Sequence, residues 1–279
     1  MADYQEIEIT VDDPVGIVRM NRPKALNALT DRGFEELKDA FAALEADPHV
    51  VGIILTGNGR GFCAGYDFSS LTDTATSGAA TPTVEIKERA VGDPTIAESF
   101  RDPTYLTAIR KPVIAAINGP AAGGGMVMAL MCDIRIAGTS AVLAPQFPKL
   151  GLASEGGIAW ILPKIVGNSK ALDLLWSGRK VRAEEALQMG IVDRVVPDDQ
   201  LVSEARAYIE GLAKTVNPWS LMTTKRMVYA GWNQTLANAS EEADTLTTEA
   251  FTRSDATEGT MAFAEKRPAK FARLEFGGE

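Results

Sequence analysis

The chain has 279 residues, of which 46% are hydrophobic and 23% charged, a composition typical of a folded globular protein. Its formal net charge of −9 and pI near 4.9 oppose binding to nucleic acid or anionic membranes, which both require a basic face. The one histidine, His49, follows Asp47 and Pro48 in a turn expected to face water, which disfavours histidine-dependent hydrolases and histidine-rich metal sites.

The first predicted elements are a β-hairpin, a helix and a buried strand. Residues 7–11 alternate apolar and polar side chains, residues 12–14 form a turn, and residues 15–20 resume as a second strand. A helix is predicted next, because apolar side chains recur three and four residues apart at Phe34, Leu37, Phe41 and Leu44. Thr30 or Asp31 can cap its start, and Asp47 and Pro48 end it. Residues 50–56 form a short apolar run that indicates a buried strand.

Residues 112–132 are apolar enough to be considered as a membrane span. Asn118, Pro120 and the glycines 123–125 interrupt them, so a strand over 111–118, a glycine loop and a buried helix over about 124–132 explain the segment better. Further strands are predicted at 133–137 and 191–196.

The two cysteines, Cys63 and Cys132, lie among apolar or small residues and are expected to be buried, reduced thiols. The N-terminus shows no signal-peptide pattern. Both features favour a cytoplasmic location.

The last third of the chain is predicted to be helical, over residues 201–214, 218–230, 236–251 and 255–265. We therefore divide the chain into an α/β core, residues 1–197, and a helical region, residues 198–279, that serves oligomerisation. Residues 72–97 are rich in Thr, Ala, Gly and Pro and are expected to be a mobile segment with some helix.

Two glycine-rich stretches follow predicted strands. The first, at residues 57–61, lacks the spacing and the following helix of a dinucleotide fingerprint, so NAD and FAD are rejected. The second, at residues 123–125, begins a helix, where free N–H groups point outward. Together the two loops can supply two backbone donors to an oxyanion, although a single glycine cluster is more often a packing turn.

Six motifs then occur in one order along nearly the whole chain: RPKALNAL at 22–29, FCAGYD at 62–67, INGPAAGGG at 117–125, LMCD at 130–133, LPKIVG at 162–167, and residues 258–267. In these motifs the chain resembles the crotonase superfamily, the enoyl-CoA hydratases and isomerases. The resemblance implies a spiral of repeated ββα units and a homotrimer or a dimer of trimers. It also implies an acyl-CoA substrate, with coenzyme A entering as part of that substrate rather than as a cofactor.

The resemblance also assigns residues to the CoA site. It implies that Lys24, Ala25 and Leu26 line this site, with Ala64 and Phe68 near the adenine. It further implies that Phe263 and Lys266 close over the nucleotide. Residues 266–273 hold four basic residues and no acid, which suits CoA phosphates, although a solvated helix end explains them equally well.

For catalysis, the resemblance implies an oxyanion hole made by the backbone N–H groups of Tyr66 and Gly124. Hydratases of this family carry two glutamates, at the positions of Val127 and Phe147 here. Since hydration needs one group for water and one for the α-proton, the chain lacks the usual pair. Phe147 is expected to form a wall of the acyl pocket, with Trp160 as a neighbour.

Glu155 matches the position of the acid in Δ3,Δ2-enoyl-CoA isomerases. We expect it to be a buried base beside an apolar wall, although a helix cap is the alternative. The leading hypothesis is an isomerase in which Glu155 moves the proton. The alternatives are a hydratase that uses Glu155 with water or a loop acid (Glu85, Glu88 or Glu98), and a CoA-thioester binding protein without catalysis.

Overall fold

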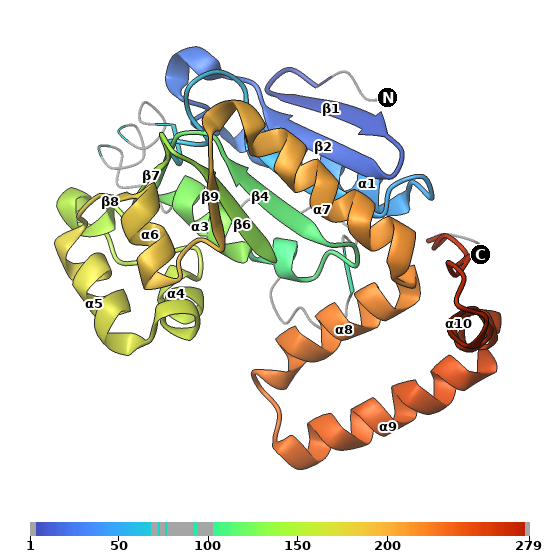
Figure 1. Cartoon of the computed structure of the whole chain (residues 1–279). Coiled ribbons are helices and arrows are strands. Elements are labelled where there is room, and N and C mark those ends of the chain that lie inside the picture. The colour runs from blue at the N-terminus through green and yellow to red at the C-terminus, as the bar shows by residue number, and fades with distance from the viewer. Residues whose placement is uncertain (1–3, 68–71, 73–75, 77–91, 94–102, 277–279) are drawn as a thin grey trace.

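A six-stranded sheet with strand order β1-β2-β3-β4-β6-β9 forms the centre of the chain (Figure 1). The computed structural model describes residues 4–67, 72, 76, 92–93 and 103–276. The prediction for residues 72–97 therefore lies almost wholly outside the described residues, as do Phe68, Glu85, Glu88 and Glu98. The strands of this sheet are β1 (Ile7–Asp12), β2 (Val15–Met20), β3 (Gly52–Gly57), β4 (Val113–Ile117), β6 (Ile134–Gly138) and β9 (Arg194–Val196).

The N-terminal hairpin and the first helix confirm the sequence prediction. Strands β1 and β2 pair antiparallel, whereas β2, β3, β4, β6 and β9 run parallel. Helix α1 (Asp31–Ala46) begins after Thr30, whose side chain accepts a hydrogen bond from the Gly33 N–H, and ends before Asp47. The side chain of His49 is 72% exposed and lies 3.4 Å from Asp13 in the hairpin turn.

The central strands are buried on both faces, as parallel strands usually are. Ile53 and Leu55 of β3 belong to the large core cluster that includes α1 and α3 (Gly124–Met131). Ile54, between them, belongs to a second cluster beneath α7 (Leu201–Thr215). The two-residue period of a strand thus divides the core into two layers, and Figure 1 shows α7 crossing one face of the sheet.

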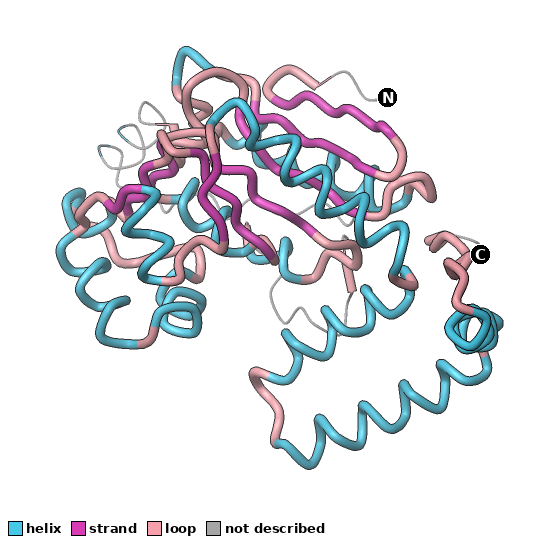
Figure 2. The backbone as a smooth tube through the Cα atoms, in the orientation of Figure 1, coloured by secondary structure: helices cyan, strands magenta, loops and turns pink. Residues whose placement is uncertain are grey.

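A second, three-stranded sheet with the order β5-β7-β8 was not predicted. Its strands are β5 (Pro120–Ala122), β7 (Val142–Ala144) and β8 (Val181–Arg182), too short for a periodicity to be recognised. Figure 2 shows it as a separate group of short magenta segments. Around it lie helices α4 (Ile158–Val166), α5 (Asn168–Ser177) and α6 (Ala183–Met189). Short 3-10 turns complete the core: η1 (Pro23–Ala25), η2 (Thr104–Thr107), η3 (Phe147–Leu150) and η4 (Asp198–Gln200).

The last three helices form an arm that extends away from the sheet, as Figure 1 shows: α8 (Pro218–Gly231), α9 (Leu236–Thr252) and α10 (Ser254–Glu265). Helix α9 buries only Leu246 among its residues, and α10 buries only Ala262. Helix α7 packs on the sheet, so the arm begins at α8, which is itself held to the core by Lys225 and Tyr229 through Asp133.

Both cysteines are buried and unbonded, as expected, and burial raises the pKa of each thiol to about 12. The segment considered as a membrane span is divided into β4, β5 and α3. Within the described ranges, no helix combines the length and apolarity that a membrane crossing requires.

Candidate active site

The segments that contain the first three sequence motifs leave the sheet at one edge. Strands β2, β3 and β4 run parallel and end at Met20, Gly57 and Ile117. Since the carboxyl ends of parallel strands meet at the same edge, residues 21–30, 58–67 and 118–125 form adjacent loops there. Ligands of parallel α/β sheets bind at this edge.

Two asparagines hold the middle loop in place. Asn27 is fully buried, and its Nδ2 donates to the carbonyls of Asn58 (2.9 Å) and Gly61 (2.7 Å). Asn118 Nδ2 donates to the carbonyls of Gly57, Gly59 and Gly61 at 2.9–3.1 Å. Residues 58–61 have no regular secondary structure, so these side chains supply the donors that the loop carbonyls need.

The predicted CoA-binding turn lies directly beside this loop. Leu26 and Asn27 both have positive φ, 49° and 58°, and the Leu26 carbonyl accepts a 2.9 Å hydrogen bond from the Ala64 N–H. Lys24 is exposed, whereas Ala25, Leu26 and Ala64 are half-buried. The structure therefore brings Lys24, Ala25, Leu26 and Ala64 together at one site, whereas Phe68 lies outside the described residues.

The two glycine-rich loops approach each other so closely that side chains do not fit between them. Cys63 forms a parallel bridge with Ala121, and its carbonyl accepts from the Ala122 N–H at 2.9 Å. A Cβ added to Gly125 would lie 2.1 Å from the Cys63 carbonyl oxygen. At Gly65, where φ is +100°, an added Cβ would lie 2.8 Å from the Ala122 oxygen. The glycines are thus required by the contact between the loops.

This contact brings the amide nitrogens of Tyr66 and Gly124 close together. The Tyr66 nitrogen lies 3.9 Å from the Cβ position of Gly124, and the Gly124 nitrogen lies 3.2 Å from that of Gly65. Gly124 is the first residue of α3, and no acceptor among the described residues takes its N–H. A helix N-terminus also favours negative charge.

The side chain of Tyr66 is directed toward α1. Its hydroxyl donates to Asp31 at 2.8 Å, and its ring stacks on that of Phe34. The backbone of this segment is fixed by a bridge to Leu29, which donates to the Gly65 carbonyl and accepts from the Asp67 N–H. Side-chain and main-chain contacts together set the orientation of the Tyr66 peptide.

The first turn of α3 continues from Gly124 to Val127, which is fully buried. A Cβ on Gly156 would lie 3.4 Å from Val127 Cγ1, so the segment carrying Glu155 packs against this turn. Phe147 is only 4% exposed and belongs to the main core cluster. The two positions at which hydratases of this family carry glutamates are therefore both apolar and buried.

Glu155 is exposed in this chain, so the expectation of a buried carboxylate was wrong. The reason is that residues 151–155 run along the surface before α4 begins at Ile158. The alternative, a helix cap, is not observed either, because Gly157 is the N-cap and no side chain caps the helix.

Trp160 does not lie beside Val127 or Phe147. Its ring packs edge-on against Trp232, 4.9 Å away between centroids, and Lys164 Nζ lies over it at 4.6 Å. On α4 the buried side chains are Ile158, Ile161 and Leu162, so Trp160 faces the opposite side. The structure thus places it toward the C-terminal arm rather than in the predicted acyl pocket.

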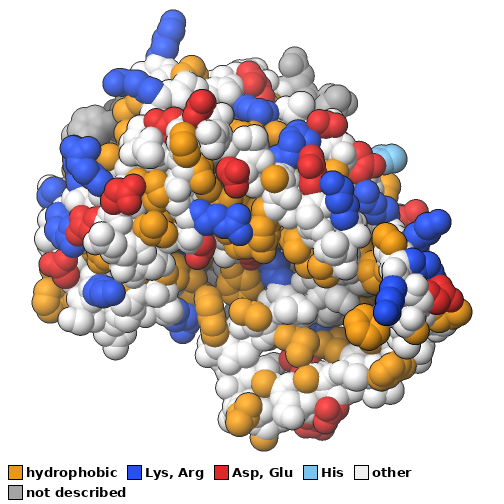
Figure 3. All heavy atoms as spheres, viewed as in Figure 1, with side chains coloured by type: hydrophobic (Ala, Val, Ile, Leu, Met, Phe, Trp, Pro, Cys, Tyr) orange, Lys and Arg blue, Asp and Glu red, His pale blue; other side chains and the backbone are white. Residues whose placement is uncertain are grey.

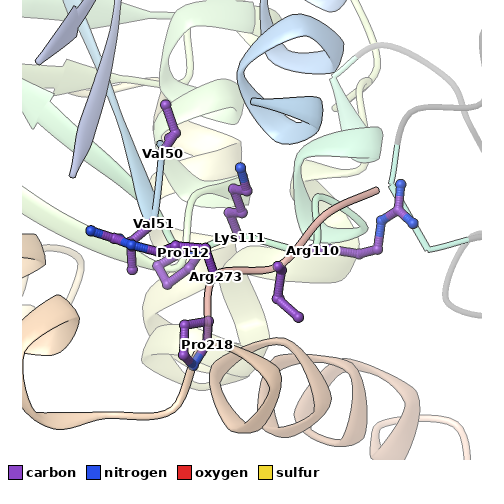
Figure 4. A pocket seen from close by; sticks show the side chains of 8 residues that line it. Val50, Val51, Arg110, Lys111, Pro112, Pro218 and Arg273 are labelled. Carbon is purple, nitrogen blue, oxygen red and sulfur yellow. The ribbon is translucent and has the colours of Figure 1, made fainter. Parts of the chain in front are cut away.

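Within one chain, Phe263 and Lys266 are also remote from the CoA-binding turn. Both are exposed, and the segment that follows them packs at the amino ends of the strands, where Arg273 Nη2 donates to Asp13 at 2.9 Å. Arg273 also lines a small hollow there together with Val50, Lys111 and others (Figure 4). That edge of the sheet is opposite the edge that carries the three loops.

The basic stretch 266–273 is largely compensated by acids elsewhere in the chain. Arg267 pairs with Glu258 and Glu265, each at 2.6 Å. The hydrogen bonds from Arg267 and from the Lys270 N–H lower the pKa of Glu258 to about 2. Only Lys266 and Lys270 of the four bases have no ion-pair partner among the described residues. The stretch therefore offers less positive charge to a phosphate than its sequence suggests.

Sequence reasoning missed Asn27 and Asn118 as supports of the loops, although both lie inside the quoted motifs. It also missed Gln146, a half-buried residue with φ of 63° that follows β7. Its side chain forms no hydrogen bond with the described part of the chain. Asn118 precedes Gly119, a common pattern, whereas Asn27 and Gln146 have no glycine neighbour, so no local signal selects these residues without coordinates.

Comparison with known proteins gives consistent matches over the full length. The family model "Enoyl-CoA hydratase/isomerase" matches residues 10–273. A probable enoyl-CoA hydratase of Mycobacterium tuberculosis is 35% identical over 271 residues, covering 96% of this chain and 98% of the relative. The mitochondrial enoyl-CoA hydratase of Pongo abelii is 36% identical over 260 residues, covering 93% and 84%.

Solved structures agree with these relatives. An enoyl-CoA hydratase subunit of Geobacillus kaustophilus superposes with a TM-score of 0.82 at 31% identity, covering 97% of this chain and 99% of that one. A probable hydratase/isomerase of Mycobacterium abscessus gives the same TM-score at 29% identity, covering 96% and 99%. The predicted α/β fold class is thereby confirmed.

Proposed function

The chain belongs to the enoyl-CoA hydratase/isomerase family of acyl-CoA enzymes, and we propose that it shifts a double bond in an enoyl-CoA thioester. In the proposed reaction Glu155 removes the α-proton of a 3-enoyl-CoA. The resulting enolate oxygen is held by the N–H groups of Tyr66 and Gly124. The same carboxyl then returns the proton at the γ-carbon, so that the double bond lies between the α- and β-carbons.

The observation that supports this proposal is that one acid, Glu155, is found near the first turn of α3 where hydratases carry two. Val127 and Phe147 are buried and apolar, and Glu155 is the acid adjacent to Gly156, which contacts Val127. Migration of a double bond needs one group that takes and returns a proton, whereas hydration also needs activation of water. Each backbone donor to an oxyanion typically contributes about 3 kcal/mol of transition-state stabilisation.

The exposure of Glu155 in the single chain bears on this role. A shuttling base must not lose its proton to bulk water before returning it, so the site needs a cover over Glu155. A second copy of the chain is one source of such a cover.

A second candidate is enoyl-CoA hydration, which the names of the relatives favour. In that case Glu155 would act with water or with a loop acid (Glu85, Glu88 or Glu98). The third possibility, a binding protein without catalysis, is an outcome of the same experiment.

We also propose that the chain assembles as a trimer or a dimer of trimers. Large apolar side chains stand exposed on the arm: Leu236 and Phe263 at 88%, and Phe251 at 77%. Figure 3 shows hydrophobic side chains gathered over this arm. A cavity of about 540 Å³ lies between α8 and the core and is lined by Leu221, Val228 and Trp232, among others. Such apolar area on a soluble chain favours burial between copies.

The test is to supply the purified protein with 3-enoyl-CoA and 2-enoyl-CoA in parallel, together with Glu155→Gln. The proposal expects conversion of the 3-enoyl thioester and a loss of at least 100-fold in kcat for the variant. Conversion of only the 2-enoyl thioester to its hydroxyacyl product would replace isomerisation by hydration. Tight binding of both thioesters with no turnover would replace both by binding.

A further inference from the structure

Gln146 follows the strand that pairs with the segment leading into Gly124. Strands β5 and β7 pair in parallel with Ala122 opposite Ala144, and the Gly123 N–H donates to the Ala144 carbonyl at 2.9 Å. One residue further, the Pro145 carbonyl oxygen still lies 3.9 Å from the Cβ position of Gly123. Gly124 and Gln146 are the residues that follow Gly123 and Pro145 on these two neighbouring segments.

The backbone at Gln146 is in a conformation that side chains rarely adopt. Its φ and ψ are 63° and −30°, and the Phe147 N–H donates to the Pro145 carbonyl at 2.8 Å, closing a three-residue turn around it. Turns of this kind with positive φ are rare and strained, and strained residues cluster at functional sites. Glycine would adopt this conformation without penalty, so the presence of glutamine calls for a role of its side chain.

The carboxamide of Gln146 is available for such a role. The residue is half-buried, and none of the described residues hydrogen-bonds its side chain. Its neighbour Phe147 is buried in the core, whereas Gln146 keeps a partly accessible amide. The segment of Glu155 packs on Val127, in the helical turn that begins at Gly124.

We propose that the carboxamide of Gln146 is a third hydrogen-bond donor to the thioester oxygen, beside the N–H groups of Tyr66 and Gly124. This inference rests on the proposed oxyanion hole. An amide fits this place because it is neutral and can donate, whereas a carboxylate there would repel the negative charge that develops on the enolate oxygen.

The test uses acetoacetyl-CoA, a thioester whose enolate has its own ultraviolet absorption band. The enolised fraction of the bound thioester reports on the oxyanion hole without any migration of a double bond. Two variants are compared with the wild type. Gln146→Gly removes the amide at a position whose φ suits glycine, so folding is preserved and the melting temperature should not fall. Gln146→Glu keeps the shape and replaces the donor by an ionisable group.

We expect Gln146→Gly to lower the enolisation constant of the bound thioester roughly ten-fold, the effect of one hydrogen bond to a charged group. Gln146→Glu should lower it further at neutral pH. The enolisation constant of Gln146→Glu, divided by that of Gln146→Gly, should rise as the pH falls, because the protonated carboxyl regains an O–H donor. A merely structural residue would show no such dependence on pH. Gln188→Glu, an exposed change of the same charge on α6, is the control and should leave enolisation unchanged.

Enolisation that is the same in the wild type and in both variants would overturn the inference, as would a ratio that does not change with pH. The proposed isomerisation can be refuted independently of the role of Gln146. If the wild type enolises acetoacetyl-CoA but moves no double bond in 3-enoyl-CoA, isomerisation is refuted while the role of Gln146 stands.

Discussion

Replacement of Asn27 tests how the loops of the site are held. The side chain makes three hydrogen bonds: Nδ2 donates to the Asn58 and Gly61 carbonyls, and Oδ1 accepts from the Arg22 N–H at 2.9 Å. At a net value of about 1 kcal/mol each, their loss in Asn27→Gly should cost about 3 kcal/mol. Asn27→Ala should cost about 1 kcal/mol more, because alanine must then adopt the positive φ of 58°.

The assay is urea unfolding at one protein concentration, followed by tryptophan fluorescence, with Asn238→Ala as the control. Asn238 is exposed on α9, and its replacement should change the free energy of unfolding by less than about 0.5 kcal/mol. Both Asn27 variants should also bind CoA thioesters more weakly, because the Leu26 carbonyl that holds Ala64 is in the same turn. The reasoning is refuted if Asn27→Gly is as stable as the wild type, or if the alanine and glycine variants are equally stable.

Three further predictions concern other parts of the chain. Gly125→Ala should abolish enolisation of bound acetoacetyl-CoA, because the new Cβ would meet the Cys63 carbonyl at 2.1 Å and separate the loops; full retention of enolisation would contradict the described contact. Burial lowers the pKa of Lys111 from 10.5 to about 8, so between these values the unfolded chain holds a proton that the folded chain has released. Raising the pH through this window should therefore stabilise the wild type relative to Lys111→Met. A difference between their melting temperatures that stays the same at every pH would be evidence against the lowered pKa. Light scattering at micromolar concentration should give the mass of three or six chains, and a monomer would contradict the proposed role of the arm.

Local signals predicted most of the elements but not their packing. The capped helix α1 and the hairpin were predicted correctly because periodicity and capping residues act within a few positions. The two glycine-rich loops were considered as joint donors to an oxyanion, and the structure shows that they are in contact. The strands β5, β7 and β8 were missed, because two or three residues carry no period.

Long-range packing decided the remaining differences. Glu155 was expected to be buried because an apolar helix follows it. Only one face of that helix, α4, reaches the core, and Glu155 lies in the exposed loop before it. Trp160 pairs with Trp232, a residue 72 positions later, which no local pattern indicates. Phe263 lies on an arm whose direction is set by packing at the amino ends of the strands. Such placements depend on contacts between distant segments.

The central claim is that one carboxylate, Glu155, removes the α-proton of an enoyl-CoA thioester whose oxygen is held by amide donors. Its most direct test is the exchange of the α-protons of 3-enoyl-CoA in deuterium oxide, followed by NMR, in the wild type and in Glu155→Gln. The account predicts that α-exchange accompanies migration of the double bond in the wild type, and that both rates fall at least 100-fold in the variant. Exchange that continues at the wild-type rate in Glu155→Gln would contradict it.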